Sequence, residues 1–306
     1  MDKQRVVILL GGTGFIGSAL AAQLVRRGEN VVSVARHLPN KQENGIEYYA
    51  CDTADSETLN EIIRKGDDIF ILTGQVGPGF DAEQEKESLR NITDVLAYFP
   101  EKKAYYASSV YVYGNTDSAA DEAYPCQPIE AYSKFKLEVE QLLQESLPDN
   151  DLIIFRLANV YGSPKNRGVI GLAINKLFAP DGTPLRINGD GNQKRDYIFL
   201  DDVAEAMVAI KDKCSHSDTV NIASGESLSL LDVIGKIAEI VGKQIPYEVT
   251  NVTLNEIRDM YVSNEKLKRV YGYEPKTSIE SGLRRTLEQY QELYQEAKSE
   301  FKLPTK

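Results

Sequence analysis

Short apolar runs alternate with helical segments through the first half of this chain, and this alternation limits the possible folds more than any other feature. The runs are rich in Val, Ile, Leu and Tyr and cover residues 5–10, 30–35, 46–50, 68–73, 102–108 and 151–157. Continuously apolar strands that alternate with helices are typical of a parallel sheet covered by helices on both faces. The sequence therefore predicts an α/β fold with a doubly wound parallel sheet.

The alternation weakens after about residue 162, which indicates a change of architecture. Gly, Pro and Asn collect at residues 162–164 and 188–192, as they do in turns and loops. The last third of the chain is predicted to be helical with short strands. We therefore expect a second, smaller C-terminal lobe.

Part of the later sequence is expected to return to the first domain. Residues 197–200 and 219–222 look like further strands of the main sheet, with a helix over residues 201–211 between them. The predicted first domain covers residues 1–165 together with 197–224, and the predicted lobe covers residues 166–196 and 225–306.

Composition indicates a globular protein of the cytoplasm. Of its 306 residues, 42% are hydrophobic, yet no stretch approaches the roughly 20 consecutive apolar residues that span a bilayer. Residues 1–5 lead directly into the first predicted strand without a signal peptide. Cys51, Cys126 and Cys214 are too few and too irregularly spaced for a disulfide framework, which favours a reducing compartment.

Charge and histidine content exclude several classes of function. A formal net charge of -11 at pH 7 disfavours nucleic acid as a partner. The chain has only two histidines, His37 and His216, so we expect neither a histidine metal site nor a Ser-His-Asp triad. Proton transfer must use another residue type, and an anionic ligand would need arginines focused in a cleft.

A glycine-rich segment follows the first predicted strand. Residues 11–17 read Gly-Gly-Thr-Gly-Phe-Ile-Gly and open a predicted helix over residues 15–27 that ends at Gly28. Such a strand, turn and helix is typical of a Rossmann dinucleotide site, where the pyrophosphate binds at the start of the helix. The predicted cofactor contacts are Gly11, Gly14, Phe15, Ile16, Gly17 and, near the end of the fourth strand, Leu72.

The end of the second predicted strand favours NADP(H) over NAD(H). An NAD site commonly has an acidic residue there, which binds the ribose hydroxyls. Here Ala35 takes that place and Arg36 follows it, and a guanidinium pairs well with a 2′-phosphate. Arg36 could instead be a solvated surface side chain, so NAD(H) stays open. Asp52, after the third strand, is expected to accept a hydrogen bond from the adenine amino group.

A serine, a tyrosine and a lysine form the predicted catalytic group. The fifth strand delivers Ser109 to the carboxyl edge of the sheet, where open α/β sheets bind ligands. Tyr132 and Lys136 are four residues apart and would share one face of a helix. An ammonium about 4 Å from a phenol contributes roughly 4 kcal/mol at an effective dielectric of about 20. We therefore expect Lys136 to lower the pKa of Tyr132 from about 10 towards about 7, which allows proton exchange at neutral pH.

Together these motifs resemble those of the extended short-chain dehydrogenases, the family of nucleotide-sugar epimerases, dehydratases and reductases. The resemblance covers nearly the whole chain. It extends to four further segments that follow in suitable order, namely residues 156–162, 189–198, 258–259 and 271–275.

The resemblance implies roles for individual residues. Tyr132 and Lys136 would be catalytic, with Lys136 also binding the nicotinamide ribose, and Ser109 would hold the reacting sugar oxygen. The residues that would hold the substrate diphosphate are Asn159, Arg195 and Arg258. Each of these two arginines precedes an aspartate, so a surface ion pair is the alternative for both.

Two departures from the family pattern guide the choice of reaction. Sugar 4,6-dehydratases resemble one another in carrying an Asp-Glu pair after the active-site residue, where this chain has Val110 and Tyr111. Neither side chain can protonate a leaving hydroxyl at neutral pH, so dehydration is disfavoured. Ala35 and Arg36 suit an exchangeable NADPH and hence a net reduction. The leading hypothesis is reduction of the 4-keto group of a 4-keto-6-deoxyhexose linked to dTDP, for bacterial surface polysaccharide such as the O-antigen of lipopolysaccharide.

Two alternatives remain open. A nucleotide-sugar 4-epimerase acting on a UDP-sugar would use the same Ser109, Tyr132 and Lys136. A non-catalytic NADP-sensing protein would keep the fold, although a binding module has no need of these three residues.

A homodimer is also considered, because relatives of this kind often dimerise through two helices. These correspond here to residues 81–99 and 130–145. An asparagine that relatives often carry in the first helix falls at Ser88, with Asn91 one turn later, so neither residue is given a catalytic role.

Overall fold

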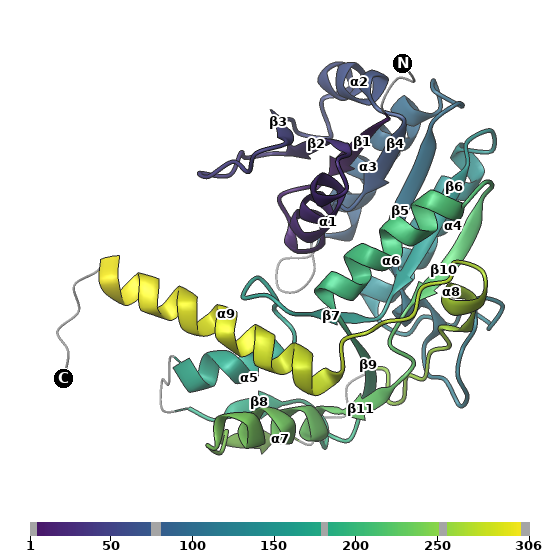
Figure 1. The fold of residues 1–306 in the computed structure, drawn as a ribbon. Coiled ribbons are helices and arrows are strands. Elements are labelled where there is room, and N and C mark those ends of the chain that lie inside the picture. Colours follow the sequence, from purple (N-terminus) through teal and green to yellow (C-terminus); the bar gives the residue numbers. More distant parts are fainter. Residues whose placement is uncertain (1–4, 75–80, 179–182, 251–255, 301–306) are drawn as a thin grey trace.

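Seven parallel strands form the central sheet. The computed structural model describes residues 5–74, 81–178, 183–250 and 256–300. Across the sheet the strands follow the order β10-β6-β5-β4-β1-β2-β3 (Figure 1), and each neighbouring pair is parallel. They are β1 (Val6–Leu10), β2 (Asn30–Ala35), β3 (Ile46–Ala50), β4 (Asp68–Ile71), β5 (Lys103–Ser109), β6 (Leu152–Leu157) and β10 (Asp218–Ile222). The predicted α/β fold with a doubly wound parallel sheet is confirmed.

Helices cover both faces of this sheet because its strands are apolar on both sides. Successive residues of a strand point to opposite faces. In β1, Val7 belongs to the buried cluster on one face and Ile8 to the cluster on the other. The helices of the first face are α1 (Phe15–Arg26) and α6 (Leu200–Lys213), and those of the second are α2 (Ser56–Lys65), α3 (Ala82–Leu96) and α4 (Ala131–Ser146).

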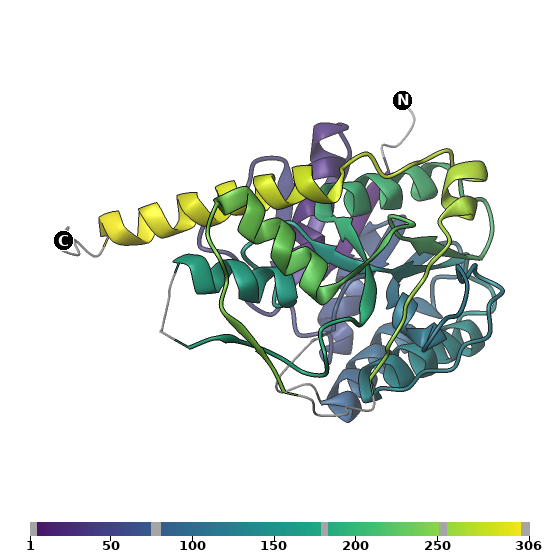
Figure 2. The same cartoon turned by 90° about the horizontal axis from the view of Figure 1, so that it is seen from below.

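A second lobe lies beyond the carboxyl ends of the central strands (Figures 1 and 2). It holds one small sheet of order β11-β9-β7 and another of order β12-β8, with helices packed around a third apolar cluster. The second lobe consists of β7 (Asn159–Tyr161), α5 (Val169–Phe178), β8 (Leu185–Ile187), β9 (Lys194–Phe199), β11 (Ser227–Ser229), α7 (Leu230–Val241), β12 (Tyr247–Val249) and α9 (Ile279–Glu300).

One strand prediction is wrong. β10 joins the central sheet beside β6, as predicted for residues 219–222. Residues 197–200 were also expected in that sheet, but β9 pairs with β7 and β11 in the second lobe. The place beside β6 is taken by β10, and β9 pairs instead in parallel with β7 and antiparallel with β11.

α9 packs on the second lobe through an amphipathic stripe. Leu283, Leu287 and Tyr290 are buried, whereas Glu288 and Glu292 are exposed. This pattern is typical of a helix that rests on a globular core. Among the described helices, none is both long and apolar enough to cross a membrane.

Candidate active site

The turn between β1 and α1 requires glycine at two positions. Gly11 has a φ of 90°, and a Cβ there would lie 3.0 Å from the carbonyl oxygen of Leu72. A Cβ on Gly17 would lie only 2.3 Å from the carbonyl oxygen of Gly11. Both contacts are with backbone atoms, so the turn keeps its shape only while these positions lack side chains.

α1 begins directly after this turn and can bind an anion. Its N-cap is Gly14, and in the described structure no side-chain hydrogen bond caps the helix. The amides of Phe15 and Ile16 belong to the first turn, where the helix dipole is positive. A glycine cradle in front of an uncapped helix fits the pyrophosphate of a dinucleotide.

A cation from the second half of the chain lies at the same place. Lys165, in the loop after β7, donates from Nζ to the carbonyl oxygen of Thr13 at 3.1 Å. A positive charge beside the positive end of a helix is unfavourable unless an anion lies between them. Sequence reasoning missed Lys165 because nothing near residue 165 marks it as a neighbour of residue 13.

Arg36 and Asp52 lie at the carboxyl ends of neighbouring strands. Arg36 follows β2 and Asp52 comes shortly after β3, and both are exposed. The N–H of Cys51 bonds to the carbonyl oxygen of Ala35 at 3.0 Å, which brings the two loops together. One oxygen of the Asp52 carboxylate accepts the N–H of Ala54 at 3.1 Å. The roles of Arg36 and Asp52 in cofactor binding stay predictions.

The three predicted catalytic residues come from β5 and α4. Ser109 ends β5, and its Oγ accepts the N–H of Tyr111 at 3.2 Å. Tyr132 and Lys136 lie in the first two turns of α4. Lys136 is buried, and its Nζ donates to the carbonyl oxygen of Ala107 at 2.8 Å. It also donates to the hydroxyl of Tyr106 at 3.1 Å, so the ammonium is directed at β5.

The expected effect of Lys136 on the acidity of Tyr132 is wrong for this arrangement. Burial raises the pKa of the Tyr132 phenol above its usual value of 10.0, and the nearby Tyr111 raises it further. The Lys136 ammonium lies 5.8 Å from the centre of the Tyr132 ring and bonds to β5 instead. Burial lowers the pKa of Lys136 itself to about 8, although Glu85 and Glu140 act in the opposite direction. Sharing one helix face did not direct the ammonium to the phenol.

Two of the three predicted diphosphate residues meet at Tyr111. Its hydroxyl donates to Oδ1 of Asn159 at 2.8 Å and accepts from Nε of Arg195 at 3.0 Å. Asn159 also donates from Nδ2 to the carbonyl oxygen of Asp196 at 3.1 Å. Arg195 is only 6% exposed, and the Asp196 carboxylate is occupied by the loop around Ser224. The surface ion pair considered for Arg195 is therefore not formed.

Arg258 is placed differently. Its side chain is exposed, and NH1 forms an ion pair with Oδ1 of Asp190 at 2.6 Å. Only its backbone reaches the neighbourhood of Arg195, because its carbonyl oxygen accepts the N–H of Lys194 at 2.9 Å. In this structure Arg258 forms a surface ion pair, although with Asp190 rather than with the adjacent Asp259.

Two tyrosines of this cluster were missed as site residues. In the sequence, Tyr111 stood out only because it replaces an acidic residue of the dehydratases. Tyr197 is 8% exposed, and its hydroxyl has no hydrogen-bond partner among the described residues. Arg195 and Tyr197 are alternate residues of β9, so they face the same side of the strand. That spacing could have revealed Tyr197 once residues 194–199 were taken as a strand.

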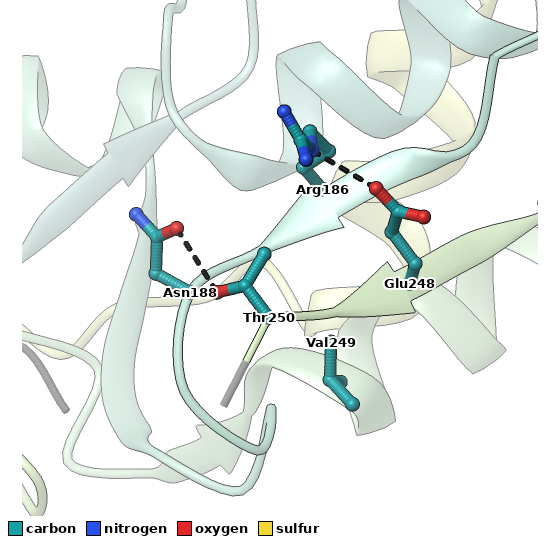
Figure 3. A pocket seen from close by; sticks show the side chains of 5 residues that line it. All are labelled: Arg186, Asn188, Glu248, Val249 and Thr250. Atoms are coloured by element: carbon teal, nitrogen blue, oxygen red, sulfur yellow. Dashed lines mark hydrogen bonds and ion pairs between the residues drawn. The ribbon is translucent and has the colours of Figure 1, made fainter. Parts of the chain in front are cut away.

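A pocket lies between β8 and β12 in the second lobe (Figure 3). Its charged side chains pair with each other, since Nε of Arg186 donates to the carboxylate of Glu248 at 2.9 Å. Val249, Thr250 and Asn188 complete the lining. The described residues contain no group of His, Cys, Asp and Glu side chains that could hold a metal ion.

The fold and this arrangement define a nucleotide-sugar enzyme of the short-chain dehydrogenase type. The family model described as the NAD dependent epimerase/dehydratase family matches residues 7–223. The chain belongs to this family.

Two named relatives align with this chain over nearly their whole length. A UDP-glucose 4-epimerase of Mycolicibacterium smegmatis is 27% identical over 305 residues, which cover 92% of this chain and 97% of that protein. A UDP-N-acetyl-alpha-D-glucosaminuronate decarboxylase of Bacillus cytotoxicus is 28% identical, with coverage of 95% and 99%.

Solved structures agree on the fold. The UDP-glucose 4-epimerase of Thermotoga maritima, solved with UDP-glucose, superposes with a TM-score of 0.85 at 24% identity, over 94% of this chain and 99% of that one. The UDP-glucuronic acid 4-epimerase of Bacillus cereus, solved with UDP-glucuronic acid and NAD, gives 0.84 at 21% identity, over 94% and 100%. At these identities the comparison shows the shared fold.

Proposed function

We propose that this protein is an NAD(H)-dependent 4-epimerase of a UDP-sugar. The observation that carries the proposal is the short segment from Ser109 to Tyr111, which joins the predicted catalytic residues to the predicted diphosphate residues. Several relatives that align over more than nine-tenths of the chain are named as UDP-sugar 4-epimerases, which supports this reaction over the 4-keto reduction that Ala35 and Arg36 favour.

Each residue of the site would have its own role in epimerisation. The bound nicotinamide supplies reversible hydride transfer. Tyr132, as the phenolate, would take the proton of the sugar 4-hydroxyl as the carbon is oxidised and return it when the other face is reduced. Burial raises the pKa of this phenol, so the role requires that the positive charges of bound NAD and Lys136 lower it again. Ser109 would hold the reacting oxygen. Lys136, whose pKa is about 8, is protonated at neutral pH and would offer the nicotinamide ribose a cation.

Tyr111 disfavours a dehydratase activity for this site. A 4,6-dehydratase needs a second acid to protonate the leaving hydroxyl. Tyr111 has its hydroxyl committed to Asn159 and Arg195, and burial raises its pKa. The proton of Tyr111 is therefore already donated to Asn159 and is not free for a leaving hydroxyl.

A second candidate is the 4-ketoreductase acting on a dTDP-linked 4-keto-6-deoxyhexose in surface polysaccharide synthesis. It is favoured by Ala35 and the exposed Arg36 at the end of β2, which suit the 2′-phosphate of NADPH. Both candidates use the same Ser109, Tyr132 and Lys136, so the fate of the hydride decides between them.

The test follows the nicotinamide signal. Purified protein is given UDP-glucose without added cofactor and, separately, dTDP-4-keto-6-deoxyglucose with stoichiometric NADPH or NADH. An epimerase interconverts UDP-glucose and UDP-galactose with no net change in reduced nicotinamide. Consumption of one NADPH per keto sugar, with no conversion of UDP-glucose, would overturn the proposal and establish the reductase.

We further propose a cytoplasmic homodimer. The three free cysteines suit a reducing compartment. α3 and α4 pack side by side and are bridged by the ion pair of Lys86 with Glu138. Light scattering with the variant Glu87→Arg, an exposed α3 position, tests dimerisation through these helices. A wild-type monomer would exclude the homodimer.

A further inference from the structure

Arg195 is a buried cation whose hydrogen-bond partners among the described residues are all neutral. Its Nε donates to the Tyr111 hydroxyl at 3.0 Å, and its NH1 donates to the carbonyl oxygens of Lys194 at 2.8 Å and Arg258 at 3.4 Å. No ion pair is found for Arg195 within the described residues. The Glu256 carboxylate acts on Arg195 through space but forms no ion pair with it, so a guanidinium that is only 6% exposed is costly unless an anion binds it directly.

Tyr111 fixes one edge of this guanidinium. The Nε edge is held by the phenol, and the Arg195 carbon Cζ lies 5.6 Å from the centre of the Tyr111 ring. NH1 is taken by the two carbonyl oxygens, so NH2 is the nitrogen of Arg195 to which the described residues supply no hydrogen-bond acceptor, and an anion would approach there. A charge-assisted hydrogen bond from NH2 to a phosphate oxygen would give this guanidinium its anionic partner.

Tyr111 is in turn held by the catalytic serine. It lies in the 3-10 turn η1 (Val110–Tyr113), and its N–H donates to Oγ of Ser109 at 3.2 Å. The same phenol also donates to Asn159, the other residue predicted to hold the diphosphate. One side chain thus sets the distance between the reacting end of the site and its anion-binding end.

We propose that Tyr111 is a positioning residue for a nucleoside diphosphate ligand, acting through Arg195 and Asn159. It holds the guanidinium edge and the amide so that the diphosphate binds at a fixed distance from Ser109 and Tyr132. The inference rests on the proposed function for its ligand class, and it predicts that the effect of Tyr111 appears in substrate affinity before it appears in turnover.

A matched control lies two residues along the same turn. The Tyr113 hydroxyl donates to Oδ1 of Asn221 at 2.7 Å and accepts from NH1 of Arg156 at 3.1 Å. Arg156, however, is paired with the Glu140 carboxylate at 2.7 Å. Tyr113 therefore makes the same pair of bonds around an arginine whose charge is already neutralised, so it offers nothing to an anion.

The experiment compares Tyr111→Phe with Tyr113→Phe. Calorimetry measures binding of UDP, dTDP and uridine, fluorescence measures binding of NADH, and kinetics measures kcat and KM for UDP-glucose. We expect Tyr111→Phe to weaken diphosphate binding and raise KM about tenfold, with kcat within about threefold and uridine and NADH binding unchanged. Tyr113→Phe should lower the melting temperature and leave both diphosphate binding and KM unchanged.

A double-mutant cycle tests whether Tyr111 affects diphosphate binding through Arg195. If Tyr111 acts through Arg195, Tyr111→Phe should add little to the loss already caused by Arg195→Lys. Equal diphosphate binding by the wild type and Tyr111→Phe, or fully additive losses, would overturn the positioning role while leaving the proposed function intact. A wild type that binds neither UDP nor dTDP would overturn both. If Tyr111→Phe loses NADH binding and hence its fold, Asn159→Ala is measured instead, and normal diphosphate binding by it would overturn the proposal.

Discussion

The cofactor end and the substrate end of the candidate site are built from different materials. The pyrophosphate cradle of the cofactor end is made of backbone from one short segment, residues 11–17, whose shape depends on the absence of side chains. The substrate end is made of side chains from separate segments that carry Tyr111, Asn159 and Arg195. A local backbone conformation can be read from neighbouring residues, whereas a cluster of distant side chains exists only after the chain has folded.

The largest expected effect is at the junction of the two ends. Tyr132→Phe should lower kcat by about 10² to 10⁴, because it removes the proposed acid and base. The melting temperature and the dissociation constants of NADH and UDP should stay close to those of the wild type. More than about a tenth of the wild-type activity in steady-state assays would rule out Tyr132 as the proton donor.

The next effect tests the backbone nature of the cofactor end. Gly17→Ala places a Cβ 2.3 Å from a carbonyl oxygen, so the turn must shift, and we expect the free energy of unfolding to fall by about 1 to 3 kcal/mol together with NADH affinity. Gly235→Ala in α7 is the control, since its Cβ would meet nothing within 4 Å. The control should stabilise the protein slightly because alanine favours helix. Chemical denaturation measures the free energy of unfolding of both variants. A Gly17→Ala variant as stable as the wild type would contradict the requirement for glycine.

A third prediction uses the buried cation between the two ends. The pKa of Lys136 is about 8 in the folded chain and about 10.5 when unfolded. Between these values the unfolded chain binds more protons, so the contribution of Lys136 to stability rises with pH and is a penalty below pH 8. Lys136→Met should therefore raise the free energy of unfolding by about 1 to 2 kcal/mol at pH 7.

The pH profile distinguishes this effect from simple repacking. The advantage of Lys136→Met over the wild type should shrink between pH 8 and pH 10 in denaturant titrations. Lys134→Met, at an exposed position of the same helix, should show no such trend. A constant difference from pH 7 to pH 10 would show that the Lys136 pKa is not lowered.

Cofactor choice sharpens the comparison further. If Arg36 binds a 2′-phosphate, Arg36→Ala should weaken NADPH binding about tenfold and leave NADH unaffected. Lys165→Ala should weaken both cofactors equally, because its ammonium lies beside the turn that fits their common pyrophosphate. Fluorescence titration measures the affinity of each variant for both cofactors. If Arg36→Ala lost the same affinity for NADH as for NADPH, the 2′-phosphate contact would be rejected.

The smallest effect is expected at Arg258. Its ion pair with Asp190 is exposed, and such pairs contribute about 0 to 1 kcal/mol. Arg258→Ala should change KM less than about threefold, in contrast to Arg195→Lys. A rise in KM as large as that of Arg195→Lys would show that Arg258 turns inward when substrate binds, as the family resemblance implies.

The sequence predicted the local parts of this molecule better than the distant ones. Strand, glycine turn and helix around residues 6–26 agree with the structure because each depends on neighbouring residues. The direction of the Lys136 ammonium was missed because it depends on a carbonyl oxygen of β5, 29 positions earlier in the chain. β9 was placed in the wrong sheet for a similar reason, since strand pairing depends on which edges are free. The role given to Tyr111 needs Asn159 and Arg195 beside it, and no local pattern places them there.

The position of β10 also bears on how the chain is made. The segment from β7 to β9 belongs to the second lobe, yet it is synthesised before the strand that completes the edge of the central sheet. A nascent chain that has not yet released Asp218–Ile222 from the ribosome would leave the edge of β6 unpaired, which invites association with other strands. For the same reason a truncated protein ending near residue 165 should aggregate rather than fold as an isolated nucleotide-binding half.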